Sequence, residues 1–299
     1  MVTWKEGVTM HFVTAKGILS SSVGMNIYRG CQHGCVYCDA RSRCYQMNHI
    51  FEDIEVKENA ISLLEAALKG KRRPCMMGTG TMSDPYIPIE KNLCMTRQML
   101  EMLDKYGFGA TLLTKSDLVL RDLDVLQRIN SRTKAVIQIS LTIMDDNLSR
   151  ILEPNVCPTS RRIEVLRELQ KAGIPTVVWL CPVLPYLTDT KENIQGILDA
   201  CRETGVKGII QYGMGLTLRD GNREYFYKAL DRHFPGLKDV YIRNYGNAYE
   251  LPSPRAIELS KFFHATCETY GIWHDNDRIN AYLREFDEKD ACTQLSLFD

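Results

Sequence analysis

The sequence has no excess of charge of either sign. Its 37 lysines and arginines balance 37 aspartates and glutamates, so the formal net charge at pH 7 is zero. Such a chain does not hold nucleic acid by bulk electrostatics, and any such binding needs a local patch. Basic residues gather in two places, which are either such patches or ordinary solvated surface: Lys69, Lys71, Arg72 and Arg73, and then Arg41 with Arg43.

Long apolar runs are also lacking. No run approaches the length that spans a bilayer, and Met1–Lys16 lacks the charged-then-apolar order of a secretory signal. The 11 cysteines of this 299-residue chain are an odd number. This argues against a disulfide framework and for reduced thiols, so we expect a cytoplasmic protein without a membrane partner. With 44% apolar residues, the chain has ample material for a core.

Short β-rich runs alternate with longer amphipathic segments over the first two thirds of the chain. The expected strands are Val23–Tyr28, Pro74–Gly78, Ala110–Thr114, Ala135–Leu141, Pro175–Cys181 and Gly208–Tyr212. The expected helices between them are Val56–Leu68, a segment around Met95–Leu103, Leu118–Ile129, Ser160–Ala172 and Asn193–Arg202. This alternation predicts an α/β fold with a parallel sheet, and six units favour a partial (β/α)6 TIM-like barrel.

After Tyr212 the alternation of strands and helices gives way to a different pattern. Glu224–Phe234 and Ala256–Tyr270 look helical and are separated by proline-containing breaks. We therefore expect an N-terminal segment (1–20), a partial barrel (21–215), a C-terminal helical extension (216–287) and a mostly polar tail (288–299).

Three cysteines stand apart from the scattered others. Cys31, Cys35 and Cys38 lie within the run CQHGCVYC. Thiolates bind soft or borderline metals, and three of them can hold three irons of a [4Fe-4S] cubane. The fourth iron is then free to chelate a small molecule through an amino and a carboxylate group. A zinc site completed by Cys44 or His33 is the alternative, although His33 lies inside the loop and is poorly placed to face the same metal.

The spacing Cys-x3-Cys-x2-Cys, with Tyr37 before the last cysteine, resembles the radical S-adenosylmethionine (SAM) superfamily. The resemblance implies a [4Fe-4S] cluster on the three cysteines, SAM as second cofactor, an external electron donor and cleavage of SAM to a 5′-deoxyadenosyl radical. Further segments are similar to the spore photoproduct lyase-like group, often labelled DNA repair photolyase. They are Asn26–Arg41, Ser83–Tyr86, Lys115, Glu153–Pro154, Arg161–Arg162 and Pro182–Pro185.

The same resemblance implies SAM contacts at the ends of several strands. Tyr37 would lie near the adenine through its backbone, and Ser83 with Asp84 would meet the amino or carboxylate end of the methionine. Lys115 would pair with the carboxylate or the ribose, and Ser140 would hydrogen-bond either one. In a parallel barrel the carboxyl ends of the strands meet at one rim, which agrees with this grouping. The ordinary alternatives are a turn, a surface lysine and a strand cap.

Two positions depart from the pattern of spore photoproduct lyase itself. The hydrogen-donor cysteine that precedes the Ser-Asp pair in that enzyme is Thr81 here, and the tyrosine after the last cluster cysteine is Asp39. An O–H bond is too strong to donate a hydrogen atom readily, so reversal of spore photoproduct by that relay is not expected. Cys181 and Tyr86 are the candidate catalytic donors, with Cys75 a further thiol nearby. An external electron and proton could instead quench the product radical.

The last residues carry a second resemblance. Gln294, Leu295, Ser296, Leu297 and Phe298 are similar to the peptide by which bacterial polymerases and repair proteins dock on the DNA polymerase sliding clamp. A polar hook followed by three apolar side chains suits a small apolar groove. The alternative is that these side chains pack back on the domain.

Together these features predict a radical SAM enzyme, a lyase or another radical-mediated activity, that repairs or modifies DNA. The alternatives are the same chemistry on RNA, a peptide or a small molecule, or a metal-stabilised clamp adaptor without activity. Aromatic residues in the C-terminal half could stack on a flipped base, although such residues are more often core. They are Tyr225, Phe226, Tyr227, Tyr241, Tyr245 and Tyr249.

Overall fold

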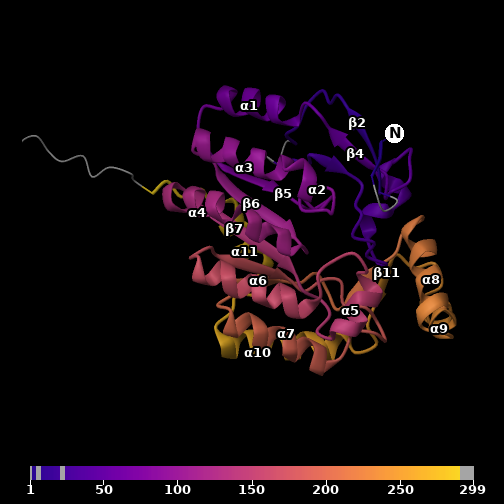
Figure 1. Cartoon of the computed structure of the whole chain (residues 1–299). Coiled ribbons are helices and arrows are strands. Elements are labelled where there is room, and N and C mark those ends of the chain that lie inside the picture. Colours follow the sequence, from indigo (N-terminus) through magenta and orange to yellow (C-terminus); the bar gives the residue numbers. More distant parts are fainter. Residues whose placement is uncertain (1, 5–7, 21–23, 290–299) are drawn as a thin grey trace, which may run out of the picture.

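The computed structural model describes residues 2–4, 8–20 and 24–289, and its centre is a parallel sheet of five strands (Figure 1). The strand order follows the chain: β5 (Met76–Thr79), β6 (Gly109–Thr114), β7 (Ala135–Ser140), β8 (Thr176–Trp179) and β9 (Gly208–Ile210). All neighbours pair in parallel. The α/β class is therefore confirmed, and these five strands coincide with the last five expected ones.

The two faces of the sheet are both covered, because alternate residues of each strand point to opposite sides. In β7, Ala135, Ile137 and Ile139 join the main core beneath the outer helices. Val136 belongs to a separate cluster on the other, inner face of the sheet. Gln138 and Ser140 share its parity along the strand, so the inner face becomes polar toward the carboxyl end of β7.

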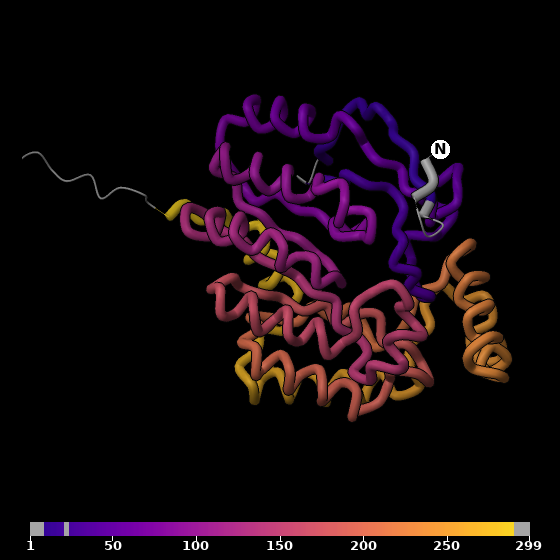
Figure 2. Tube along the Cα trace, viewed as in Figure 1, coloured from indigo at the N-terminus to yellow at the C-terminus, as the bar shows by residue number. Residues whose placement is uncertain are grey.

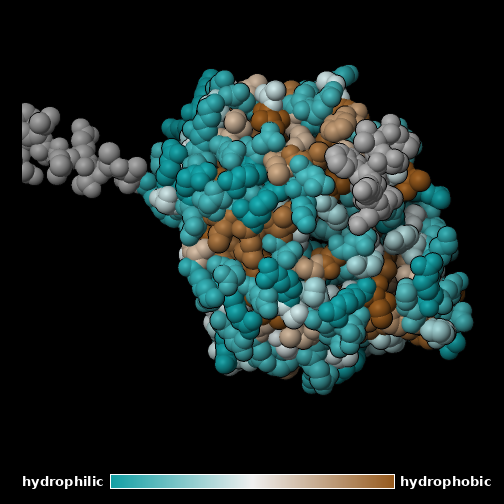
Figure 3. Space-filling model, in the orientation of Figure 1, coloured by the Kyte–Doolittle hydropathy of each residue, from teal (hydrophilic) through white to brown (hydrophobic). Residues whose placement is uncertain are grey.

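Helices cover the outer face of the sheet in a continuous layer, as the cartoon and the Cα trace both show (Figures 1 and 2). These helices are α1 (Ala60–Gly70), α3 (Met95–Tyr106), α4 (Leu123–Arg132), α6 (Thr159–Lys171), α7 (Lys191–Glu203) and α10 (Ala256–Tyr270). The visible face of this layer is mostly hydrophilic, with hydrophobic residues showing in the furrows between elements (Figure 3). Shorter elements link the layers: α2 (Glu90–Leu93), α5 (Asp146–Leu152) and the 3-10 turns Asp39–Arg41, Arg43–Tyr45 and Asp117–Asp122.

The inner face is closed at the end where the strands begin. There α11 (Asn276–Arg284) packs Ile279 and Leu283 against apolar side chains from four strands. These side chains are Met76, Val136, Val177 and Ile210. The segment before α11 also joins the sheet, because Ile209 donates its N–H to the Trp273 carbonyl at 2.8 Å. The opposite end of the inner face, where the strands finish, is left for the site.

The first expected strand, Val23–Tyr28, joins the sheet by only one bridge within the described residues. Gly24 pairs in parallel with Gly78, and the Met25 N–H donates to the Gly78 carbonyl at 2.8 Å. The chain then turns away, and β3 (Tyr28–Arg29) pairs antiparallel with β4 (Ile54–Lys57). The prediction that a helix starts at Val56 was wrong. Residues 54–57 form a strand, in which buried and half-buried side chains alternate, and the helix begins at Ala60.

A small N-terminal sheet in the order β1-β2-β4-β3 was not anticipated. It contains β1 (Val2–Trp4) and β2 (Val8–Val13), and β2 pairs in parallel with β4. A second small sheet comes after the parallel strands in the sequence. In it, β10 (Gly215–Thr217) pairs with β11 (Glu250–Pro252), and the helices α8 (Asn222–His233) and α9 (Leu237–Tyr245) lie between these two strands in the chain. Within the described ranges, no helix has the length and apolar character needed to cross a lipid bilayer.

Candidate functional site

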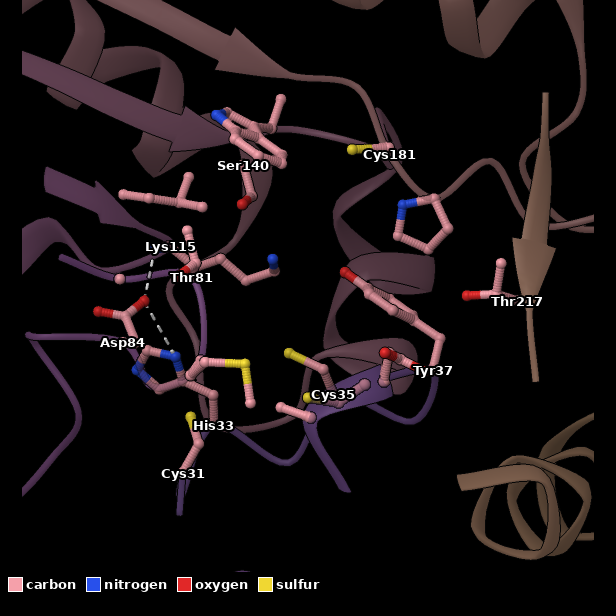
Figure 4. Close-up of a pocket in the computed structure, with 18 of the residues that line it drawn as sticks. Cys31, His33, Cys35, Tyr37, Thr81, Asp84, Lys115, Ser140, Cys181 and Thr217 are labelled. Carbon is pink, nitrogen blue, oxygen red and sulfur yellow. Dashed lines mark hydrogen bonds and ion pairs between the residues drawn. The ribbon is translucent and has the colours of Figure 1, made fainter. Parts of the chain in front are cut away.

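A cavity of about 450 Å³ lies at the carboxyl ends of the parallel strands. It is lined by all the predicted metal-binding and cofactor-binding residues and by one of the two predicted hydrogen donors. These residues are Cys31, Cys35, Tyr37, Cys38, Ser83, Asp84, Lys115, Ser140 and Cys181. They come from five separate segments, so the rim geometry expected for a parallel barrel brings them together (Figure 4).

The loop with the three cysteines starts from a turn that requires glycine. Gly30 has φ +91°, and a Cβ there would lie 2.5 Å from the Phe51 carbonyl oxygen. That carbonyl also accepts the Cys31 N–H at 3.1 Å. Ser83 closes the turn from the other side, because its hydroxyl donates to the Gly30 carbonyl at 2.6 Å. The start of the loop is therefore held by hydrogen bonds of the protein itself, without the help of a metal.

The three thiols are free and line the cavity together. Burial, followed by the nearby Asp84 and Cys38, raises the pKa of Cys31 to about 12, and burial likewise raises the pKa of Cys35 and Cys38. Buried thiols of this kind become thiolate ligands only with a metal to compensate the charge. The donor set of three sulfurs fits an iron–sulfur cluster, which distributes its ligands over separate irons.

A single zinc ion suits these thiols less well. Thiolates on one zinc stand about 3.8 Å apart, given Zn–S bonds of ~2.3 Å in a tetrahedron. Among the described residues, the three sulfurs do not form a group whose atoms all lie within 4.8 Å of one another. The proposed fourth ligands are also engaged elsewhere. His33 Nδ1 lies 3.4 Å from Asp84 Oδ2, and the exposed Cys44 accepts from Arg219 Nη1 at 3.2 Å.

Asp84 connects the cysteine loop to the end of β6. Its carboxylate accepts the Thr114 hydroxyl at 2.7 Å and the Lys115 N–H at 2.8 Å, and it faces His33. The loop before it passes close over the same strand, because a Cβ at Gly80 (φ +108°) would lie 2.0 Å from the Leu113 carbonyl oxygen. Asp84 thus connects the cysteine loop to the end of β6, and both of these segments line the cavity.

The amine of Lys115 extends into the cavity, between the cysteine loop and the far wall (Figure 4). Its Nζ lies 4.0 Å from Glu153 Oε1. Burial opposes the charge, but Cys35 in its thiolate form and the Glu153 carboxylate outweigh it and raise the pKa of Lys115 above its usual value. The side chain therefore presents a fixed positive charge to anything that enters.

A buried hydrogen-bond network lies next to Lys115. Its members Glu153 and Arg162 belong to segments that the family resemblance includes, but the sequence analysis gave them no role. Glu153 accepts hydrogen bonds from the Tyr37 hydroxyl and from Arg162, and both members of the Glu153–Arg162 pair are 1% exposed. Arg162 also donates to the carbonyls of Ser140 and Cys157, each at 3.0 Å. Burial would raise the pKa of Glu153, but Arg162, Lys115 and the Tyr37 hydroxyl together lower it, so Glu153 stays ionised.

The same segment supports the cysteine loop through its backbone. The Val36 N–H donates to the Leu152 carbonyl at 2.9 Å, and the Asn155 N–H donates to the His33 carbonyl at 3.1 Å. The Asn155 side chain adds a bond to the Gln32 carbonyl at 2.7 Å. The link between α5 and α6 is therefore the scaffold of the loop, although it lies more than a hundred residues further along the chain.

The far wall of the cavity contains Ser140 and Cys181. Among the described residues, the Ser140 hydroxyl has no hydrogen-bond partner, so it is available to a ligand. Burial raises the pKa of the Cys181 thiol to about 12, with Lys115 opposing, which keeps the S–H intact at neutral pH. Sequence reasoning missed two aromatic residues here. Trp179 donates to Gln138 Oε1 at 2.7 Å, and the 60% exposed Tyr212 lies beside it with ring centroids 5.8 Å apart.

Tyr86, the other candidate hydrogen donor, does not line the cavity. Its N–H donates to Asp84 Oδ1 at 2.8 Å, which turns the following chain into the core. The ring is 1% exposed, does not line the cavity and lies under the guanidinium of Arg121 at 5.9 Å. The structure therefore leaves Cys181 as the one predicted donor that reaches the cavity.

The expected basic patches do not surround the cavity. Residues 69–73 come just before β5, at the end of the sheet where strands begin, and the cavity lies at the other end. Arg41 stacks on Tyr225 at 3.6 Å and pairs with Glu52 at 2.6 Å, while Arg43 pairs with Asp220 at 3.1 Å. Both arginines near the site are therefore already paired with carboxylates.

The aromatic residues of the C-terminal half are mostly core, which was the ordinary expectation. Phe226 and Tyr241 are fully buried, and Tyr225, Tyr227 and Tyr245 pack around them. Tyr249 is the exception, since it is 44% exposed and accepts from Arg219 Nη2 at 2.8 Å. None of the six lines the cavity at the strand ends.

Comparison with known proteins agrees with this geometry. The family model described as the radical SAM superfamily matches residues 25–201. An uncharacterized protein of Methanocaldococcus jannaschii, MJ0683, is 36% identical over 234 residues, which cover 77% of this chain and 78% of the relative. An uncharacterized protein of Mycobacterium tuberculosis, Rv2578c, is 28% identical over 265 residues, which cover 83% and 76% of the two chains.

Among solved structures, spore photoproduct lyase complexed with dinucleoside spore photoproduct has a similar fold. The TM-score is 0.61 at 14% identity, and the match covers 89% of this chain and 81% of that one. A mutant of the same enzyme gives a TM-score of 0.63 at the same identity and coverage. At this identity the likeness establishes the shared fold and nothing finer.

Proposed function

The chain belongs to the radical SAM superfamily, and we propose that it uses this chemistry to repair or modify DNA. It is an enzyme of a family that uses a [4Fe-4S] cluster and SAM. When bound, those cofactors would supply a 5′-deoxyadenosyl radical for the abstraction of a hydrogen atom from the substrate. The observation that carries the proposal is the single cavity that contains three free thiols, a charged lysine, a free serine hydroxyl and a protonated thiol.

In this proposal each wall of the cavity has its own task. Cys31, Cys35 and Cys38 would hold the cluster. Lys115 offers its charge to the SAM carboxylate, and Ser140 offers a hydroxyl that no described side chain uses. Ser83 and Asp84 shape the methionine end of the pocket through their bonds to Gly30, Thr114 and Lys115 rather than through an exposed charge. Tyr37 fixes the loop by its hydroxyl, leaving its backbone for the adenine.

Two features support DNA as the substrate. The fold is similar to that of spore photoproduct lyase, which was solved in complex with dinucleoside spore photoproduct. Trp179 and Tyr212 line the cavity, and Tyr212 is largely exposed, so a base extruded from a duplex would meet an aromatic surface there. Because Arg41 and Arg43 are already paired with carboxylates, we expect base stacking to contribute more than phosphate contacts.

We propose that the hydrogen-atom relay differs from the one that the resemblance assigns to spore photoproduct lyase. Thr81 and Asp39, at the positions that the resemblance assigns to the donor cysteine and its tyrosine, both line the cavity. We propose that Cys181 returns the hydrogen atom instead. Its location on the cavity wall and its raised pKa both support this role, because a weak S–H bond is the donor that the reaction requires.

The first test is anaerobic incubation of the reduced holoenzyme with SAM and with UV-treated or untreated DNA labelled with deuterium. We expect deuterium to enter 5′-deoxyadenosine only when the substrate lesion or base is present. In Cys181→Ala, formation of 5′-deoxyadenosine should stay within about twofold while the product that regains hydrogen falls by at least about tenfold. Cys75→Ala is the matched control, because Cys75 is also half-buried but does not line the cavity.

Other outcomes would redirect the proposal. Deuterium transfer from RNA or a peptide, with none from DNA, would exclude DNA as the substrate while keeping the radical chemistry. If Cys75→Ala lowered the yield of the product that regains hydrogen as much as Cys181→Ala does, the loss could not be assigned to a donor on the cavity wall. The role of Cys181 as donor would then be contradicted.

The tail from Gln294 to Phe298 lies outside the described residues, and docking on the sliding clamp stays a proposal based on its sequence. Deletion of these five residues should abolish binding to the purified clamp, because it removes the apolar side chains that would fill the groove of the clamp. It should leave SAM cleavage unchanged. Binding can be followed by surface plasmon resonance. Undiminished clamp binding by the shortened chain would contradict the docking role.

A further inference from the structure

Two histidines and two carboxylates converge on the N-terminal sheet, away from the cavity at the strand ends. One ligand atom from each of His11, His49 and Asp53 lies within 4.8 Å of the others. His11 lies in β2, Asp53 precedes β4, and His49 comes from the loop that leads to β4. None of them lines the cavity with the three cysteines. We propose that they form a second metal site, selective for a zinc-type divalent ion.

The hydrogen bonding of His49 prepares it as a ligand. Its Nδ1 lies 3.1 Å from the Ile50 carbonyl oxygen, and since a carbonyl can only accept, this nitrogen carries the proton. Nε2 is then left with a free lone pair. A metal-binding histidine typically donates its second ring N–H to a carbonyl or carboxylate in this way, which fixes both tautomer and ring orientation.

Two buried atoms of the group have no hydrogen-bond partner among the described residues. They are His49 Nε2 and Asp53 Oδ1. Buried polar atoms are ordinarily paired, so two unpaired atoms within one small group of possible metal ligands indicate a missing ligand. A plain ion pair explains only part of this arrangement. His11 Nδ1 lies 3.2 Å from Asp53 Oδ2, and this contact leaves the other two atoms unused.

Glu55 supplies a fourth possible donor. Its Oε2 lies 3.7 Å from His49 Nε2, and the residue is the register partner of His11 across the β2–β4 pair. Two imidazole nitrogens with carboxylate oxygens are a donor set that zinc accepts in tetrahedral geometry. His49 also lines a separate hollow of about 680 Å³, which gives an ion a path to the site.

The location of the site indicates a structural role. The loop that carries His49 continues to Phe51, whose carbonyl accepts the Cys31 N–H. Arg41, just after the cysteine loop, pairs with Glu52 in the same stretch. A metal that joins His49 to β2 and β4 would therefore stabilise the segment that contains Phe51, whose carbonyl binds the backbone of Cys31, the first of the three cluster cysteines.

Zinc and iron content of the full chain distinguish this site from the cluster. The holoenzyme is prepared anaerobically, equilibrated with micromolar Zn²⁺, dialysed and assayed by elemental analysis. We expect about one tightly held zinc per chain beside the cluster iron. His49→Ala should lose the zinc and keep the iron, and Cys35→Ala should do the reverse. His264→Ala is the matched control and should keep both, because its ring packs against Phe263 and His274 and it lines neither the cavity with the three cysteines nor the hollow beside His49.

Two further measurements protect the test against a variant that fails to fold. Asp53→Asn preserves the size of the side chain and should lose zinc while keeping its circular dichroism. In Cys35→Ala, zinc at a hundredfold excess over its Kd should raise the Tm by about 4 °C, and His49→Ala in that background should abolish the shift. A folded chain that takes up no zinc, or that retains its zinc fully in His49→Ala and Asp53→Asn, would overturn the proposal.

Discussion

Replacement of Cys35 by alanine is expected to remove the iron and to lower reductive SAM cleavage by at least about a thousandfold. Cys35 is a buried thiol on the cavity wall, within the electrostatic reach of Lys115 and beside the two other cluster cysteines. Two remaining thiols cannot hold a cubane of this type. Iron content and the visible absorption of the anaerobically reconstituted protein would measure the first effect, and 5′-deoxyadenosine formation the second.

Cys44→Ser provides the control for this loss. Cys44 is an exposed free cysteine six residues after Cys38, and it does not line the cavity. Iron content and SAM cleavage should match those of the unchanged chain. If Cys44→Ser lost its metal as completely as Cys35→Ala, four thiols rather than three would be ligands. A zinc site with all positions filled would then replace the cluster.

Substitution of Glu153 by glutamine should destabilise the apoprotein by about 3–5 kcal/mol, because it leaves the buried Arg162 without its counter-charge. The amide keeps the size of the side chain, so the loss reports charge rather than a cavity. The effect should reach the metal as well. The segment around Glu153 holds the cysteine loop through the bonds from Val36 and Asn155, so iron should be retained less tightly.

Denaturant unfolding of the metal-free chain measures the first effect, and the rate of iron release to a chelator measures the second. Glu203→Gln is the matched control. Glu203 pairs with Arg167 at 3.5 Å on the surface, where both side chains are about half exposed. Its loss should cost no more than about 0.5 kcal/mol. Equal costs for the two substitutions would mean that the Glu153–Arg162 pair contributes nothing special to the scaffold.

The sheet was predictable because its strands are short apolar runs between well-marked helices. Runs such as Ala135–Leu141 are buried on both faces, and helix ends such as Gly107 are signalled by their residue type. The pairing of β2 with β4, which joins the two halves of the N-terminal sheet, was missed because it brings together residues far apart in the sequence, such as His11 and Glu55. Local periodicity contains no information about such partners.

The site shows the same division between local and distant information. The cysteine spacing and the strand ends located the cavity, since both are local signals. The brace formed by Glu153 and Arg162 was not anticipated, because its importance comes from burial beside Tyr37, 116 positions earlier in the sequence. Tyr86 was misplaced because neighbouring residues in a turn point in different directions. The sequence identifies Ser83–Tyr86 as a turn but not which side chain enters the core.

The position of α11 has a consequence for how this chain can be divided. The recognisable family region ends at residue 201, yet the inner side of its strands is sealed by Ile279 and Leu283 from far beyond that point. A piece cut at 201 would expose Met76, Val136 and Val177 to water and would lack β9 as well. The sheet is thus completed by a helix from the C-terminal part of the same chain, and we expect a fragment that ends at residue 201 to aggregate rather than fold.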